Sequence, residues 1–211
     1  PEAVLVYSST GLEGMTHTFH DLYRTHLIRE TWAGRPRPSL VNNWEATYFD
    51  FDTEKLLDIA RTAAGRGIEM LVLDDGWFGC RDTDDNSLGD WFVNEKKLPG
   101  GLKYLADQIN ALGMKFGLWV EPEMVSPNSE LYRTHPDYAI QIPGRKPMEA
   151  RHQLVLDVSR PEVRECVYAQ LKAALSSANI EYVKWDMNRT LTDVAGFCLE
   201  ADRQGELLHR Y

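Results

Sequence analysis

Carboxylate side chains follow several short apolar runs of this sequence. The four runs, each with the acidic residues that end it, are Leu71-Val72-Leu73-Asp74-Asp75, Gly117-Leu118-Trp119-Val120-Glu121, Leu154-Val155-Leu156-Asp157 and Tyr182-Val183-Lys184-Trp185-Asp186. Tryptophans and cations accompany these carboxylates, namely Trp77, Trp119, Trp185, Lys184 and Arg151. Carboxylates accept hydrogen bonds from hydroxyl groups, and aromatic faces cover C–H patches. The combination favours a neutral, hydroxyl-rich ligand such as a sugar.

Two of these groups are the most informative. Asp74 and Asp75 are adjacent, so they repel each other unless cations or ligand hydroxyls bind them. Lys184 and Asp186 alternate along a predicted strand and point to the same side, where the ammonium would keep the carboxylate ionised. An ionised carboxylate can serve as a glycosidase nucleophile. Two structural alternatives stay open: Asp residues that cap a turn, and a buried ion pair.

The elements that position these residues alternate between strand and helix. The expected strands cover residues 39–44, 70–73, 115–120, 154–156 and 180–185, and a hairpin is expected near residues 138–148. Helices are expected after Asp52 or Thr53, over residues 102–112, after Pro161 behind a Ser159–Glu162 capping box, and over residues 194–210. This order predicts an α/β fold, a parallel (β/α)₈ TIM barrel with its chemistry at the carboxyl ends of the strands. Five strands make only part of such a barrel.

Residues 1–35 differ from the remainder. Residues 4–7 look like a strand, residues 8–14 look like a loop, and residues 15–30 show no clear helical face. We interpret residues 1–35 as the tail of a preceding domain with a linker, and residues 36–211 as the N-terminal part of the barrel.

Composition excludes several classes of partner. The formal net charge of -9 argues against a nucleic-acid backbone, and no apolar stretch approaches the roughly 18 residues of a membrane span. The first residues do not read as a signal peptide. The three cysteines are widely spaced without a Cys-x-x-Cys pair, which favours reduced thiols in a cytoplasmic protein. No cofactor and no metal is expected.

Five motifs together resemble the retaining α-galactosidases of glycoside hydrolase family 36. They are Val41-Asn42-Asn43-Trp44-Glu45-Ala46-Thr47, Leu73-Asp74-Asp75-Gly76-Trp77-Phe78-Gly79, Gly89-Asp90-Trp91, Trp119-Val120-Glu121-Pro122-Glu123-Met124 and Lys184-Trp185-Asp186-Met187-Asn188-Arg189. The match runs through nearly the whole chain. It implies that residues 1–35 end an N-terminal β-sandwich domain and that the rest begins the catalytic barrel.

The resemblance also implies roles for individual residues. Asp186 would be the nucleophile that forms a covalent galactosyl-enzyme, and Asp74 and Asp75 would bind the 4- and 6-hydroxyls of galactose. The other implied sugar-site residues are Lys184, Arg151, Trp119, Trp44 and Asn188, whereas Trp185 alternates away into the barrel wall. The substrates would be terminal α-D-galactosides of the melibiose and raffinose type, and the full-length parent is expected to be a homo-oligomer. The family's general acid/base aspartate lies on a later strand, so the isolated chain is expected to be inactive.

Three other functions remain as alternatives. A metal-dependent barrel of the enolase kind would use Asp74, Glu121 and Asp157 as ligands, since it also sets carboxylates at successive strand ends. A non-catalytic galactose-binding fragment and a galactosyltransferase of the same family are the others.

Overall fold

The computed structural model describes residues 3–211, and the chain divides into two compact units, residues 1–38 and residues 39–211. The first unit contains helix α1 (Gly11–Leu22), a π-helical turn (Tyr23–Leu27) and a 3₁₀ turn (Glu30–Trp32). Two expectations are wrong here: residues 4–7 form no strand, and a helix occupies residues that showed no helical face. The predicted helices α3 and α4 bury an apolar face, whereas α1 buries none of its side chains.

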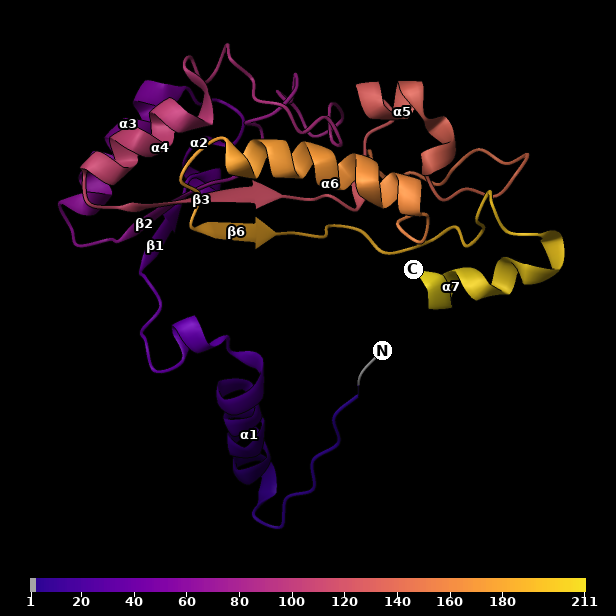
Figure 1. The fold of residues 1–211 in the computed structure, drawn as a ribbon, viewed down its shortest axis with the longest axis horizontal. Helices are drawn as coiled ribbons and strands as arrows, with labels where there is room; N and C mark the ends of the chain where they lie inside the picture. The colour runs from indigo at the N-terminus through magenta and orange to yellow at the C-terminus, as the bar shows by residue number, and fades with distance from the viewer. Residues whose placement is uncertain (1–2) are drawn as a thin grey trace. The chain divides into compact units, whose positions relative to one another are not determined.

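The second unit is built on a four-stranded parallel sheet in the order β1-β2-β3-β6 (Figure 1). Its strands are β1 (Leu40–Asn42), β2 (Met70–Leu73), β3 (Lys115–Val120) and β6 (Tyr182–Trp185). All side chains of β2 are buried, as are those of β3 after Lys115. Burial on both faces explains why these two strands read as continuous apolar runs. The α/β class with a partial parallel barrel is confirmed.

One expected strand of the barrel belongs elsewhere. β5 (Leu154–Val155) pairs antiparallel with β4 (Met124–Val125) in a separate two-stranded sheet. A short apolar run shows that a strand is buried but does not identify its partner, so residues 154–156 were wrongly expected in the parallel sheet. The hairpin expected near residues 138–148 is also misplaced. The turn lies at 150–153, where the backbone groups of Ala150 and Gln153 bond to each other.

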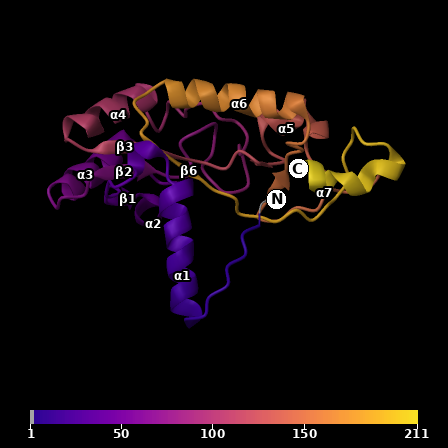
Figure 2. The ribbon, with the colours of Figure 1, turned by 60° about the horizontal axis from the view of Figure 1, so that its bottom comes forward.

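Three longer and three short helices accompany the sheet in this unit. The longer ones are α3 (Thr53–Ala64), α4 (Gly101–Ala111) and α6 (Pro161–Ser176), and the short ones are α2 (Trp44–Thr47), α5 (Glu130–Thr134) and α7 (Leu207–Arg210). α4 packs against β3 and α3, and buried side chains of α6 join the same hydrophobic core. Figures 1 and 2 show α4 and α6 on one side of the strands. The Asp52 side chain caps α3 by accepting the Lys55 N–H at 2.9 Å, as predicted.

Other helix ends differ from expectation. α6 begins with Pro161 as predicted, but the capping box is wrong, because the Ser159 hydroxyl bonds to Asp157 and α6 has no side-chain cap. Residues 194–200 are irregular, and only a 3₁₀ turn (Ala201–Glu206) and α7 follow them. The irregular stretch after β4 contains the short helix α5 and then a 3₁₀ turn (Pro136–Tyr138). Among residues 3–211, no helix has the length and apolarity needed to cross a membrane.

Candidate functional site

The carboxyl ends of the parallel strands bring the predicted acids together. β2, β3 and β6 are paired in register, with Trp119 of β3 opposite Lys184 of β6. Since side chains alternate along a strand, the residues that end these strands on one face are Asp74, Glu121 and Asp186. A parallel sheet places such ends at one edge, where α/β barrels bind their substrates.

Asp74 is bound by side chains from β1, the strand next to β2, and from β6, two strands away. Its Oδ2 accepts a hydrogen bond from Asn42 Nδ2 at 2.6 Å and pairs with Lys184 Nζ at 2.7 Å. Its backbone N–H donates to Asn43 Oδ1 at 2.8 Å. Asp74 itself is 3% exposed, whereas the Lys184 side chain is 39% exposed. The ammonium thus reaches Asp74 while part of it stays open to a ligand.

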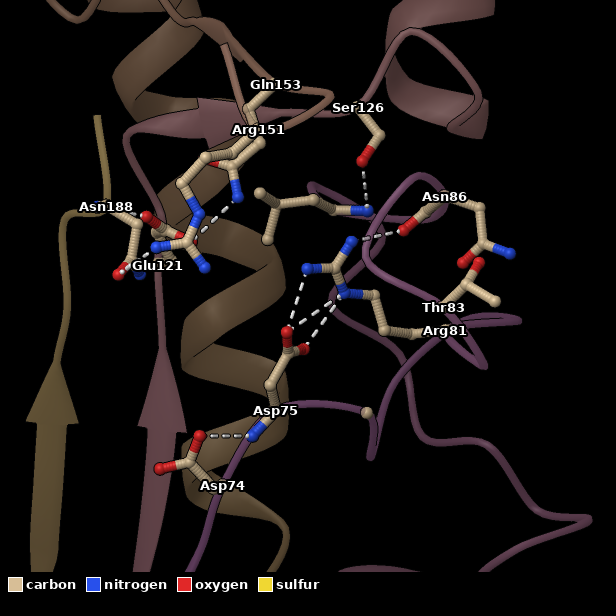
Figure 3. A network of polar contacts seen from close by, with 12 residues as sticks. Asp74, Asp75, Arg81, Thr83, Asn86, Glu121, Ser126, Arg151, Gln153 and Asn188 are labelled. Atoms are coloured by element: carbon tan, nitrogen blue, oxygen red, sulfur yellow. Dashed lines mark hydrogen bonds and ion pairs between the residues drawn. The ribbon is translucent and has the colours of Figure 1, made fainter. Parts of the chain in front are cut away.

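Asp75 has a different environment from its neighbour. Arg81 donates to both Asp75 oxygens, with Nε at 2.9 Å from Oδ1 and Nη2 at 2.8 Å from Oδ2 (Figure 3). Both residues are buried, and Arg81 Nη1 also donates to the Asn86 carbonyl at 2.8 Å. Burial raises the pKa of Asp75 above its usual value, and the Arg81 guanidinium opposes this rise. The two adjacent carboxylates therefore have separate cationic partners, and the backbone N–H of Asp75 donates to Asp74 Oδ1 at 2.9 Å.

Asp186 follows directly after β6 and is held by hydrogen bonds. Its backbone N–H donates to the Val120 carbonyl at 2.9 Å. Its Oδ2 accepts from Trp119 Nε1 at 3.0 Å and from Asn188 Nδ2 at 2.8 Å, and its Oδ1 accepts the Met187 N–H at 3.0 Å.

These contacts set the charge of Asp186. Burial acts to raise its pKa, but the hydrogen bonds from Trp119, Asn188 and Met187, with the nearby Lys184 charge, lower the pKa below its usual value. Asp186 is therefore ionised at neutral pH. Lys184 lowers the pKa of Asp186 through its charge alone, because its ion pair is with Asp74.

Arg151 reaches the site from a strained turn. Arg151 and His152 are the two central residues between Ala150 and Gln153, and both have positive φ, 52° and 56°. Such two-residue hairpin turns normally take Asn or Gly, so two bulky residues here place the backbone under strain. Arg151 is exposed, and its Nη1 donates to Asn188 Oδ1 at 3.0 Å (Figure 3).

The tryptophans divide between the site and the wall. Trp119 is buried beside Asp186, and its carbonyl accepts from Trp77 Nε1 at 2.9 Å. Trp44 begins α2, and its ring packs edge-on against Tyr48 and Phe49, near the end of β1. Trp185 is 60% exposed, and its Nε1 donates to Glu123 at 3.3 Å. It lines an apolar groove with α6 side chains, which agrees with its assignment to the barrel wall.

Two residues of the network were not foreseen. Asn42 ends β1, so its place at the edge of the sheet could have been read from the strand assignment. Arg81 lies in the long loop after β2, six positions after Asp75, and no periodic signal links the two residues.

The structure does not gather a metal-ligand set. Within residues 3–211, no three His, Cys, Asp or Glu side chains are placed to hold one ion. Asp157, one of the three ligands of the enolase-like alternative, is instead bound by Ser159. The donor geometry therefore gives that alternative no support.

Known proteins resemble this chain along its whole length. The family model described as Melibiase matches residues 1–211. Alpha-galactosidase AgaA of Geobacillus stearothermophilus is 59% identical over 211 residues, which are 100% of this chain and 29% of AgaA. Alpha-galactosidase Mel36A of Lactobacillus acidophilus is 52% identical over the same 211 residues, again 29% of the relative.

A crystal structure of a GH36 alpha-galactosidase agrees with this fold. It is an AgaA variant in complex with raffinose, with a TM-score of 0.95, 59% identity, and coverage of 98% of this chain and 29% of that one. The chain thus spans about 29% of the length of the relatives it matches. On the family match and these identities, the chain belongs to the Melibiase family, which confirms its resemblance to the glycoside hydrolase family 36 α-galactosidases.

Proposed function

We propose that the protein containing this chain is a retaining α-galactosidase in which Asp186 is the nucleophile. The observation that carries this proposal is the Asp186 carboxylate, ionised and oriented by Trp119 and Asn188 beside the Lys184–Asp74 pair. The relatives named above are α-galactosidases, and one of them has been solved with raffinose. The substrates would accordingly be terminal α-D-galactosides of the melibiose and raffinose type.

The reaction would proceed in two displacements. An Asp186 oxygen attacks the anomeric carbon as the glycosidic C–O bond breaks, and the leaving oxygen takes a proton from a general acid. In the second displacement a water molecule gives a proton to the same group, now acting as a base, and its oxygen attacks the anomeric carbon, which releases Asp186. The resemblance assigns the acid/base to an aspartate outside these 211 residues, so the chain would supply the nucleophile half of the mechanism.

The remaining site residues would recognise the sugar. Lys184, partly exposed, would donate to ring hydroxyls while it keeps its bond to Asp74. Arg151 and Asn188, already bonded to each other, would contact the sugar beside Asp186. Asp74 and Asp75 would select galactose through its 4- and 6-hydroxyls, Trp119 would line the ring site, and Trp44 would lie at its rim.

Replacing Asp186 in the whole protein tests the mechanism. The Asp186→Ala variant should lose nearly all turnover of an aryl α-galactoside, and added azide should yield β-galactosyl azide, because the azide occupies the place of the lost carboxylate. Asp58→Asn is the matched control, since Asp58 is an exposed carboxylate of α3 paired with Arg61. Wild-type turnover by Asp186→Ala would refute the proposal.

Three finer points belong to the same proposal. The 211-residue chain alone should not hydrolyse melibiose, which an assay of purified chain checks against the whole protein. The whole protein is expected to be a homo-oligomer, measurable by sedimentation. The free thiols Cys80, Cys166 and Cys198 favour a cytoplasmic location, which cell fractionation would test.

A further inference from the structure

Glu121 is a buried carboxyl group that the proposed mechanism leaves without a role. It follows β3 directly and is 1% exposed. One of its oxygens, Oε1, accepts the backbone N–H of Asn188, and Oε2 accepts from Gln153 Nε2 at 3.3 Å (Figure 3). A buried carboxyl is costly unless its hydrogen bonds serve the structure or the site.

Asn188 is the junction through which Glu121 reaches the site. The Asn188 side chain donates from Nδ2 to Asp186 Oδ2 at 2.8 Å and accepts at Oδ1 from Arg151 Nη1 at 3.0 Å. Asn188 lies beyond the end of β6, where no strand pairing holds the backbone. Among the described contacts, only Glu121 accepts its backbone N–H. This hydrogen bond therefore fixes the position of the Asn188 backbone from which the amide side chain extends.

We infer that Glu121 is a positioning residue, which fixes the backbone at Asn188 so that one amide side chain orients both Asp186 and Arg151. The inference rests on the proposed function, because it assigns Glu121 a purpose only if Asp186 is the nucleophile. Glu121 would touch neither the sugar nor the reacting atoms. Its contribution would be the geometry of the attacking carboxylate.

The position of Glu121 depends on hydrogen bonding rather than on its charge. Burial raises the pKa of Glu121, and the charges of Asp186 and Asp75 add to this rise while the bonds from Asn188 oppose it. The other charged groups around Asp186 and Glu121 are Lys184, Asp74, Arg81 and Arg151. In either charge state, Glu121 Oε1 can accept the Asn188 N–H.

A glutamine at position 121 should therefore make the same hydrogen bonds as the carboxyl group of Glu121. Its carbonyl oxygen can accept from Asn188, and its amide can donate to Gln153. Gln153 Oε1 is buried and has no hydrogen-bond partner among the described residues, so the Gln153 amide can turn to accept that bond.

The test compares three variants of the whole protein. Glu121→Ala should lower kcat/KM for an aryl α-galactoside on the order of 10²-fold, the scale of a catalytic group misplaced by about 1 Å. Its acid limb should move to higher pH, because Asp186 loses a well-placed donor. Glu121→Gln should stay close to wild type, with no upward move of the limb. Glu123→Gln is the matched control, since Glu123 bonds to Trp185 on the opposite face.

The outcomes separate this inference from the proposed function. Wild-type kcat/KM and acid limb in Glu121→Ala, alongside an inactive Asp186→Ala, would overturn the role of Glu121 and leave the function standing. An active Asp186→Ala would overturn the function itself.

If Glu121→Ala fails to fold, Glu121→Asp decides the matter. The shorter aspartate keeps the charge but draws back from Asn188, so it should lose activity and shift the acid limb upward while Glu121→Gln does neither. The opposite ranking, an active Asp variant and an impaired Gln variant, would show that charge matters and would overturn the inference.

Discussion

The central strands β2 and β3 and the edge strand β6 contribute to the same site, but their side chains differ in exposure to solvent. β2 and β3 are buried on both faces, whereas Tyr182, Val183 and Trp185 of β6 are 40%, 38% and 60% exposed. The carboxyl groups that follow these strands differ correspondingly in the direction of their pKa shifts. Burial raises the pKa of Asp75 and of Glu121, which follow the central strands, whereas hydrogen bonds outweigh burial and lower that of Asp186, which follows β6.

The carboxyl groups that follow these strands therefore differ in how they are held. A carboxyl group at the end of a buried strand is held by buried protein partners, as Asp75 is by Arg81. A carboxylate at the less covered edge stays ionised because a few directed donors stabilise its charge. The fold thus holds its most buried acids, Asp75 and Glu121, at the ends of the central strands, the rigid centre of the sheet, and holds the ionised Asp186 at the β6 edge.

The largest expected effect is at the rigid centre. Asp75→Ala leaves the Arg81 guanidinium buried and unpaired, which should destabilise the protein by about 3–5 kcal/mol. The denaturant midpoint of the purified protein measures this. The double variant Asp75→Leu with Arg81→Met should recover much of the loss, since it removes both charges. A wild-type midpoint for Asp75→Ala would contradict the view of Asp75 as part of the rigid centre.

The next effect concerns the packing of β3. Leu118 is fully buried, so Leu118→Ala should cost about 2–5 kcal/mol through lost burial and a cavity. Its register partner across the sheet is Val183 of β6, so the two positions compare a centre and an edge at one level. The same denaturation experiment checks the value. A loss well below this range would mean that the centre repacks easily.

The third effect is a pH dependence at the edge. Asp186 has a pKa below its ordinary value of 3.8, so kcat/KM should not fall through Asp186 until the pH is below 3.8. The same depressed pKa gives a stability contribution that is present above the unfolded value and is lost as pH falls through the folded one. Asn188→Ala removes one donor and should move this limb upward. A limb from Asp186 well above 3.8 in the wild type would contradict the assigned hydrogen bonds.

The sequence predicted the central strands because burial leaves a direct record in the residues. The bounds of β2 and β3 agree with the runs at 70–73 and 115–120, and Asp74, Glu121 and Asp186 follow from the strand ends. The strand at 154–156 was assigned to the wrong sheet because apolar runs carry no information about the partner. α1 was missed because it buries no side chain.

The structure brings several of the predicted residues together at one edge of the sheet, but their pairings were not predicted. The adjacency of Asp74 and Asp75 predicted that cations or ligand hydroxyls would bind them. It could not identify Arg81 as the partner of Asp75, because Arg81 lies in a loop whose path no local pattern encodes. Lys184 was expected to sit beside Asp186 and keep it ionised; its charge does lower the pKa of Asp186, but its ion pair is with Asp74, after β2. Which side chains meet across strands depends on register and rotamers, and these are set by the whole packing.

The smallest expected effect is at Val183, and it shows whether the edge is open only in these 211 residues. Val183→Thr should change the stability of the 211-residue chain by no more than about 0.5 kcal/mol, because the side chain is already 38% exposed. In the whole protein, a neighbouring segment that covers β6 would bury the new hydroxyl and raise the cost above that of the isolated chain. Denaturation of both forms, each against its own wild type, measures the difference. Equal small costs would mean that β6 is an open edge in the whole protein as well, and that the described contacts with Trp119, Asn188, Met187 and Val120 are those that position Asp186.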